Sequence, residues 1–151
     1  MITNQRIEVL RIISKKLEGK NINWCLIGST NLALQGIEIE PNDIDIMADK
    51  QGAYEIGELL GEYETRPVQY KEAGTFAGYK GKFKINNIEI EVIGELKIKN
   101  VYRPIGGHIV MVKIDSLAIP CMDLKSEYEA YQKLGRKEKA ELIRQKLKTI
   151  P

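Results

Sequence analysis

The chain has 151 residues, a length that fits one domain with a substantial core and not two ordinary ones. Lys and Arg number 23 and Asp and Glu 21, so the net charge of +2 gives no general attraction to nucleic acid or to an anionic membrane, and a dedicated binder of duplex DNA is not expected. No signal peptide opens the sequence and no apolar run approaches the roughly 20 residues of a membrane span. Cys25 and Cys121 lack the spacing of a zinc or redox site, which favours reduced, buried thiols in a cytoplasmic protein. A charged fraction of 29% would suit a thermophile.

After a first helix capped by Thr3, the chain predicts a strand followed by a turn that suits a phosphate. The expected strand covers residues 22–27 and ends at Gly28. Ser29 is the expected N-cap of a short helix over residues 29–35. Free backbone N–H groups and the helix dipole at such a start favour a phosphate, so Gly28 and Ser29 are candidate nucleotide-binding residues.

Two aspartates one residue apart follow this helix. The sequence Asp43-Ile44-Asp45-Ile46 alternates polar and apolar side chains, which predicts a strand over residues 43–47 with both carboxylates on one face. Their Cα atoms would lie about 6.5–7 Å apart, two residues of strand rise. Two uncompensated carboxylates this close repel each other, and a hard cation such as Mg²⁺ would relieve the repulsion. Asp43 and Asp45 are therefore candidate metal ligands.

The middle of the chain predicts a helix capped by Asp49 and then several short strands. Asn86-Asn87 is a credible hairpin turn, and the strand after it places Glu89 and Glu91 on one face; alternation alone cannot separate these two glutamates. The glycine-rich stretch 74–81 is either an ordinary hairpin connection or a flexible loop on the substrate side. The strand candidates are residues 66–70, 78–85 and 88–93.

The C-terminal part predicts two helices, over residues 122–151, that follow an α/β core of residues 1–121 within a single domain. This part is rich in Lys and Arg. The ordinary explanation is a solvated face, and the alternative assigns Lys133 or Arg136 to a triphosphate or an acceptor. The only histidine, His108, has no partner at ligand spacing and is expected to be structural or exposed.

Gly28-Ser29, thirteen residues and Asp43-Ile44-Asp45-Ile46 together resemble the signature of the DNA polymerase β-type nucleotidyltransferase superfamily. The chain is most similar to small stand-alone prokaryotic members grouped with lincosamide nucleotidyltransferases and with abortive-infection nucleotidyltransferase-like proteins. The resemblance implies a minimal nucleotidyltransferase fold of the α+β class, a mixed twisted sheet flanked by helices with a C-terminal helical pair. The third acid of the family usually precedes an apolar pair, a position that Glu91 matches better than Glu89.

The same resemblance implies metal-dependent transfer of a nucleoside monophosphate from an NTP, with ATP the expected donor, to a hydroxyl acceptor with release of pyrophosphate. Asp43, Asp45 and Glu91 would be the catalytic residues and would hold Mg²⁺ or Mn²⁺, while Gly28 and Ser29 would bind the nucleotide. The acceptor is open: a small antibiotic-like compound, a protein hydroxyl and an RNA end all fit.

Two rival interpretations come from other classes. One is a non-catalytic nucleotide-binding or toxin–antitoxin-type interaction module on the same fold, and the other is an Asp-x-Asp that is only the polar face of a strand. A homodimer or an antitoxin-like partner is compatible with the fold class.

Overall fold

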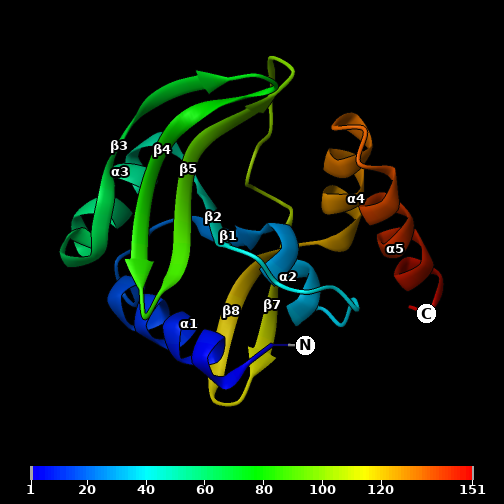
Figure 1. The fold of residues 1–151 in the computed structure, drawn as a ribbon, viewed down its shortest axis with the longest axis horizontal. Helices are drawn as coiled ribbons and strands as arrows, with labels where there is room; N and C mark the ends of the chain where they lie inside the picture. The colour runs from blue at the N-terminus through cyan, green and yellow to red at the C-terminus, as the bar shows by residue number, and fades with distance from the viewer. Residues whose placement is uncertain (1, 151) are drawn as a thin grey trace.

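The computed structural model describes residues 2–150, which form helices on both sides of a single sheet (Figure 1). The helices are α1 (Asn4–Leu17), α2 (Gly28–Leu34), α3 (Lys50–Leu59), the 3-10 helix η1 (Gly61–Tyr63), α4 (Leu124–Lys133) and α5 (Lys137–Lys148). The strands are β1 (Trp24–Ile27), β2 (Ile44–Ala48), β3 (Glu64–Ala73), β4 (Phe76–Ile85), β5 (Ile88–Ile98), β6 (Val101–Tyr102), β7 (Ile109–Ile114) and β8 (Leu117–Met122).

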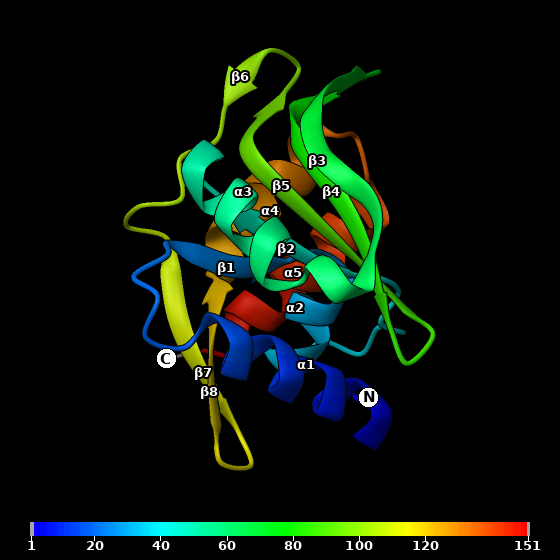
Figure 2. The same ribbon diagram turned by 90° about the vertical axis from the view of Figure 1, so that its left-hand side faces the viewer.

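The strands form one mixed sheet in the order β3-β4-β5-β2-β1-β8-β7, with β6 paired to β5. The β2–β5 and β1–β8 pairs are parallel, and the remaining pairs are antiparallel. The sheet is strongly curved, so that β3, β4 and β5 arch over the same side on which α4 and α5 stand (Figures 1 and 2). This arrangement confirms the α+β class with a mixed twisted sheet and a C-terminal helical pair.

The main core lies between the sheet and the helices α1 and α3. Leu10, Ile13, Ile46, Phe83 and Ile90 are almost wholly buried there, and each such side chain stabilises the fold by about 1.5–3 kcal/mol. A smaller apolar cluster joins α2 to α4 and α5. The helices α1 and α3 cover one face of the sheet. The opposite face of the central strands β5, β2 and β1 is turned toward α4.

Several element boundaries differ from the sequence expectation. The first strand begins at Trp24 and not at residue 22, and β2 begins at Ile44, so Asp43 lies immediately before the strand. The stretch 74–81 is an ordinary hairpin, since Gly74 and Thr75 make the turn and β4 starts at Phe76. Cross-strand pairing extends these strands beyond the short apolar runs visible in the sequence.

Ser29 is not the N-cap of α2, which corrects the sequence prediction. The helix begins one residue earlier, at Gly28, and its N-cap Ile27 makes no side-chain cap hydrogen bond. Gly28 has φ +77°, a left-handed conformation that glycine adopts without a Cβ penalty, and this turn lets the helix start directly at the end of β1. The predicted caps Thr3 and Asp49 are confirmed.

Within residues 2–150, no helix is both long enough and apolar enough to cross a membrane.

Candidate active site

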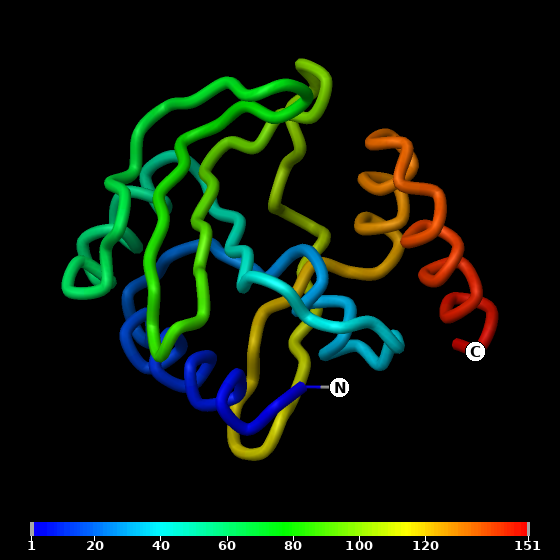
Figure 3. Tube along the Cα trace, in the orientation of Figure 1, coloured from blue at the N-terminus to red at the C-terminus, as the bar shows by residue number. Residues whose placement is uncertain are grey.

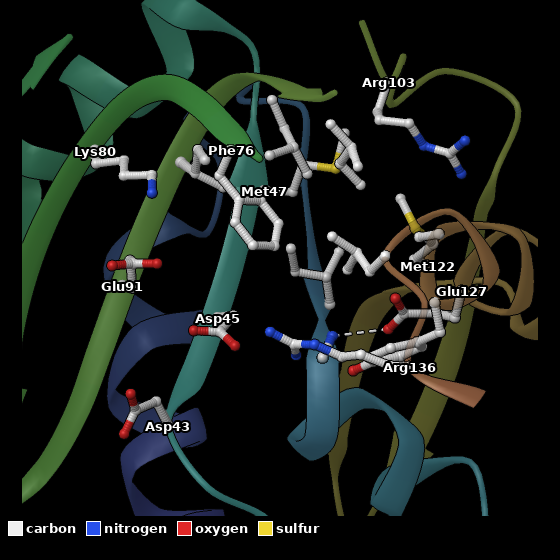
Figure 4. A pocket seen from close by; sticks show the side chains of 18 residues that line it. Asp43, Asp45, Met47, Phe76, Lys80, Glu91, Arg103, Met122, Glu127 and Arg136 are labelled. Carbon is white, nitrogen blue, oxygen red and sulfur yellow. Dashed lines mark hydrogen bonds between the residues drawn. The ribbon is translucent and has the colours of Figure 1, made fainter. Parts of the chain in front are cut away.

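A cavity of about 270 Å³ lies between the curved sheet and α4 (Figure 4). Its sheet wall carries three carboxylates, Asp43, Asp45 and Glu91. Below these groups it borders Gly28, and across from them it borders Glu127 of α4. Apolar side chains of β2, β5, β8 and α4 fill the wall between the polar groups. The cavity therefore combines an acidic cluster with an apolar lining.

Strand register brings the acidic cluster together. Asp45 of β2 stands directly beside Glu91 of the parallel neighbour β5, and beside Ile27 of β1 on the other flank. Neighbouring strands lie about 4.8 Å apart, so the two side chains leave the same face of the sheet at close range. Asp43 lies two residues before Asp45 and faces the same cavity.

The two glutamates that alternation could not separate occupy different surroundings. Glu91 lines the cavity with the two aspartates. Glu89 lies two residues earlier on β5, does not border the cavity, and forms an exposed ion pair with Lys84 of β4 at 3.4 Å. Of the two, only Glu91 is placed to act with Asp43 and Asp45.

The start of α2 positions the segment that carries Asp43. The Ser29 hydroxyl oxygen accepts a hydrogen bond from the Asn42 backbone N–H at 2.8 Å, and the Thr30 hydroxyl donates to the Asp43 carbonyl at 3.0 Å. Ser29 itself is 7% exposed and does not border the cavity, whereas Gly28 does. The structure thus places Ser29 beneath the site and Gly28 on its wall.

Gly28 lies against the carboxylate of Asp45. A Cβ at position 28 would stand 2.7 Å from Asp45 Oδ2, closer than real Cβ contacts. The Gly28 backbone N–H, which the sequence suggested for a phosphate, donates to Glu127 Oε2 at 2.7 Å. One of the free N–H groups at the helix start is therefore already engaged by a carboxylate of the chain itself.

Burial, and then the neighbouring carboxylates, raise the pKa of the central member of the acidic cluster. Burial raises the pKa of Asp45 to about 7, and the negative charges of Glu91 and Asp43 contribute in the same direction. Within residues 2–150, none of these three carboxylates forms an ion pair with a Lys, Arg or His side chain. The cluster holds negative charge that the chain does not neutralise by direct contact.

The donor set fits a hard divalent cation completed by a phosphate. Among residues 2–150, no three Asp, Glu, His or Cys side chains stand close enough to enclose a metal ion by themselves. Mg²⁺ is usually held by only one or two carboxylates together with substrate phosphates and water. Asp43, just before β2, and Asp45, within it, could supply these carboxylates, with Glu91 of β5 beside Asp45.

Glu127 of α4 is a site residue that the sequence argument did not identify. It is 4% exposed, and its Oε2 accepts from both the Gly28 N–H and the Asn31 side-chain amide, the latter at 2.8 Å. Burial raises its pKa to about 7. The sequence carried one signal that this residue is buried. Glu127 lies three residues after Leu124 and four before Tyr131, on the apolar face of the helix, where a charged residue is unusual.

Three cations border the cavity as well, Lys80 of β4, Arg103 and Arg136. Arg103 lies on the connection after β6, which runs between the arched strands and α4 (Figure 3). Arg136 is the N-cap residue of α5. Lys133 does not border the cavity, so of the two basic residues singled out in the sequence only Arg136 is placed at the site.

Solved structures with a similar fold include nucleotidyltransferases. A proposed nucleotidyltransferase from Thermotoga maritima is 33% identical, with a TM-score of 0.83 over 99% of this chain and 97% of that one. ANT(2'')-Ia in complex with adenylyl-2''-tobramycin is 11% identical, with a TM-score of 0.63 over 95% of this chain and 90% of that one. The lincosamide antibiotic adenylyltransferase LnuA with lincomycin bound is 12% identical, with a TM-score of 0.54 over 83% and 84%. At these low identities, the last two structures show only that the fold is similar.

The fold and its solved relatives define a small nucleotidyltransferase. The profile of the aminoglycoside-2''-adenylyltransferase family matches residues 9–148, and the chain belongs to that family. No curated protein sequence gives a significant match.

Proposed function

We propose that this protein transfers a nucleoside monophosphate, from ATP, to a hydroxyl acceptor and releases pyrophosphate. The observation that carries the proposal is the placement of Asp45 and Glu91 side by side on parallel strands, with Asp43 facing the same cavity. Family membership favours the same reaction class.

The residues of the chain divide into an acidic side and a cationic side. Asp43, Asp45 and Glu91 would hold Mg²⁺ or Mn²⁺, and a bound divalent ion neutralises charge on the phosphates and polarises the α-phosphorus. Lys80 and Arg136 border the same cavity and would bind the triphosphate oxygens. Gly28 gives close backbone approach beside Asp45, and Ser29 acts on the nucleotide site by fixing the backbone before Asp43.

Transfer requires little covalent chemistry from the protein. The chain would hold the α-phosphate in line between the acceptor oxygen and the leaving pyrophosphate, and would offset the charge that develops there. The apolar part of the lining, which includes Met47, Phe76 and Leu96, excludes water from one side of this volume. Exclusion of water strengthens each electrostatic contact and suppresses hydrolysis of the NTP.

The acceptors named for the structural relatives give rational first probes. The ANT(2'')-Ia complex contains an adenylylated tobramycin, and the LnuA complex contains lincomycin. Both are hydroxyl compounds of small size. We therefore propose a small hydroxyl compound as the first acceptor class to test, ahead of a protein hydroxyl or an RNA end.

A non-catalytic module on the same fold is the second candidate. It would bind ATP with a divalent ion and a partner protein without transferring the nucleotide. Asp45 favours catalysis over this alternative, because it is half-buried beside two other carboxylates and has no ion-pair partner among residues 2–150, which is costly for a purely structural role.

The experiment that tests the proposal is incubation with each α-labelled NTP and Mg²⁺ or Mn²⁺, with tobramycin, lincomycin, a short RNA and the protein itself as acceptors. We expect label from ATP on a hydroxyl compound with wild type, and none with Asp45→Asn. Metal-dependent binding of ATP without label on any acceptor would favour the module instead. Label transfer by Asp45→Asn at the wild-type rate would refute the assignment of the site.

A further inference from the structure

Glu127 is buried on the helix wall of the cavity, yet only one of its two carboxylate oxygens is engaged. Oε2 accepts both hydrogen bonds, from the Gly28 N–H at 2.7 Å and from Asn31 Nδ2 at 2.8 Å. Among residues 2–150, none donates a hydrogen bond to Oε1. Within residues 2–150, the only enclosed side-chain N or O atom without a partner is Ser14 Oγ, so Glu127 Oε1 is open to the cavity. Figure 4 shows this free oxygen on the side of the Glu127 carboxylate that faces away from the dashed hydrogen bond.

The two bonds hold the Glu127 carboxylate in a fixed orientation. Asn31 is wholly buried, and its amide also donates to the Met122 carbonyl at 3.0 Å, while its side-chain oxygen accepts from Gln35. A network of this kind leaves the side chain little freedom to rotate. Oε1 therefore keeps its direction toward the cavity, on the wall opposite Asp45 and Glu91.

The charges around Glu127 set its proton affinity. Burial raises the pKa of Glu127 to about 7. The two hydrogen bonds and the Arg103 guanidinium lower the pKa of Glu127, and the charge of Asp123 raises it. The other titratable groups that sense Glu127 are Asp45, Tyr131, Cys25 and Cys121. A carboxyl group balanced near neutral pH is suited to accept a proton and then release it to water.

We propose that Glu127 is the general base of the reaction, and that its free oxygen Oε1 takes the proton of the acceptor hydroxyl. The inference rests on the proposed function and assigns it one further catalytic residue. The acceptor would lie between the α4 wall and the acidic cluster, with its hydroxyl facing Glu127 Oε1 and the α-phosphate.

The step balances in atoms and charge. A bond forms between the acceptor oxygen and the α-phosphorus, the bond from the α-phosphorus to the bridging oxygen breaks, and pyrophosphate leaves with that electron pair. The hydroxyl proton moves to Glu127 Oε1 and afterwards to solvent. Asp43, Asp45 and Glu91 would then be needed only to hold the divalent ion, and a carboxylate that holds a cation is a weaker base than a free one.

The arrangement of hydrogen bonds supplies a sharp variant. In Glu127→Gln, the amide oxygen can accept the bonds from Gly28 and Asn31 that Oε2 accepts now, and the amide nitrogen replaces the free oxygen, which removes the base and keeps both contacts. Glu129→Gln is the matched control, because Glu129 is exposed on the same helix. Glu127→Ala removes base and contacts together.

The measurement is single-turnover transfer of α-labelled ATP to tobramycin and to lincomycin between pH 5.5 and 9, with ATP binding and thermal unfolding measured on the same samples. For wild type we expect a rate that rises with pH through about 7 and then levels. For Glu127→Gln we expect the rate to fall by about 100- to 10,000-fold and to rise with hydroxide concentration without levelling, with ATP affinity unchanged. Glu129→Gln should match wild type.

Four outcomes would overturn the proposal. Wild-type transfer that is independent of pH over this range excludes a base that titrates near neutrality, whether or not any variant folds. A Glu127→Gln protein with the wild-type rate and pH profile excludes Glu127 as the base. Loss of ATP binding and thermal stability in Glu127→Gln to the extent seen in Glu127→Ala assigns a structural role instead. Absence of transfer by wild type to every acceptor tested, namely tobramycin, lincomycin, a short RNA and the protein itself, removes the proposed function, and this inference with it.

Discussion

Replacing Asp45 by Asn should make the metal-free protein more stable at alkaline pH while it abolishes transfer. Burial, and then the charges of Glu91 and Asp43, raise the pKa of Asp45 from its ordinary 3.8 to about 7. A carboxyl group with a raised folded-state pKa stabilises the fold below its unfolded pKa and loses that contribution as pH rises toward the folded value. Between about pH 4 and pH 7, wild type should therefore lose stability that Asp45→Asn keeps.

The size of the effect follows from the same shift. Ionising Asp45 in the folded state costs at most about 4 kcal/mol above pH 7. Water that enters the partly open cavity and relaxation of the side chains reduce this to about 1–2 kcal/mol. For a domain of this length, that gain raises the Tm by roughly 2–8 °C.

The assay is urea and thermal unfolding of wild type and Asp45→Asn without metal at pH 8 and at pH 4.5. We expect the variant to be more stable at pH 8 and the difference to be mostly gone at pH 4.5. Glu129→Gln is the control, because Glu129 is exposed and does not border the cavity, and its replacement should change stability by no more than about 0.5 kcal/mol. An Asp45→Asn protein less stable than wild type at pH 8, or a difference independent of pH, would refute the electrostatic argument.

Three further predictions concern the other walls of the cavity. Glu91→Gln should lower transfer by at least about 100-fold and Glu89→Gln should leave it within about twofold, measured with α-labelled ATP; equal losses would contradict the assignment of the third acid. Gly28→Ala should destabilise the protein by about 1–3 kcal/mol in urea unfolding, because φ is +77° and the new Cβ meets a carboxylate oxygen at 2.7 Å; unchanged stability would show that the turn relaxes. Arg136→Ala should weaken ATP binding about tenfold by calorimetry without lowering the Tm, and Lys133→Ala should not change it.

Local patterns predicted the elements that carry the acidic cluster. The alternation in Asp43-Ile44-Asp45-Ile46 placed both aspartates on one face of a strand, and the structure has this face on the cavity. Asn86-Asn87 predicted the hairpin that leads into β5, and both residues have positive φ. These features follow from period, turn chemistry and caps, which are local properties of a chain.

The features of the site that local patterns did not predict depend on contacts between segments that are distant in sequence. Alternation treats Glu89 and Glu91 alike, and only the parallel register of β2 with β5 sets Glu91 beside Asp45. The predicted Ser29 cap was wrong because Gly28 turns the chain one residue earlier. Glu127 escaped notice because its role depends on contact with the start of α2, 99 residues away in sequence.

Asp43 and Asp45, with Glu91 beside them, should hold a divalent ion on which the triphosphate is positioned. The most direct test is anomalous diffraction from crystals grown with Mn²⁺ and a non-hydrolysable ATP analogue. We expect a manganese peak within about 2.0–2.3 Å of carboxylate oxygens of Asp43 and Asp45, beside Glu91 and shared with phosphate oxygens. A nucleotide bound with its phosphates away from this cluster, or a manganese ion bound elsewhere, would contradict it.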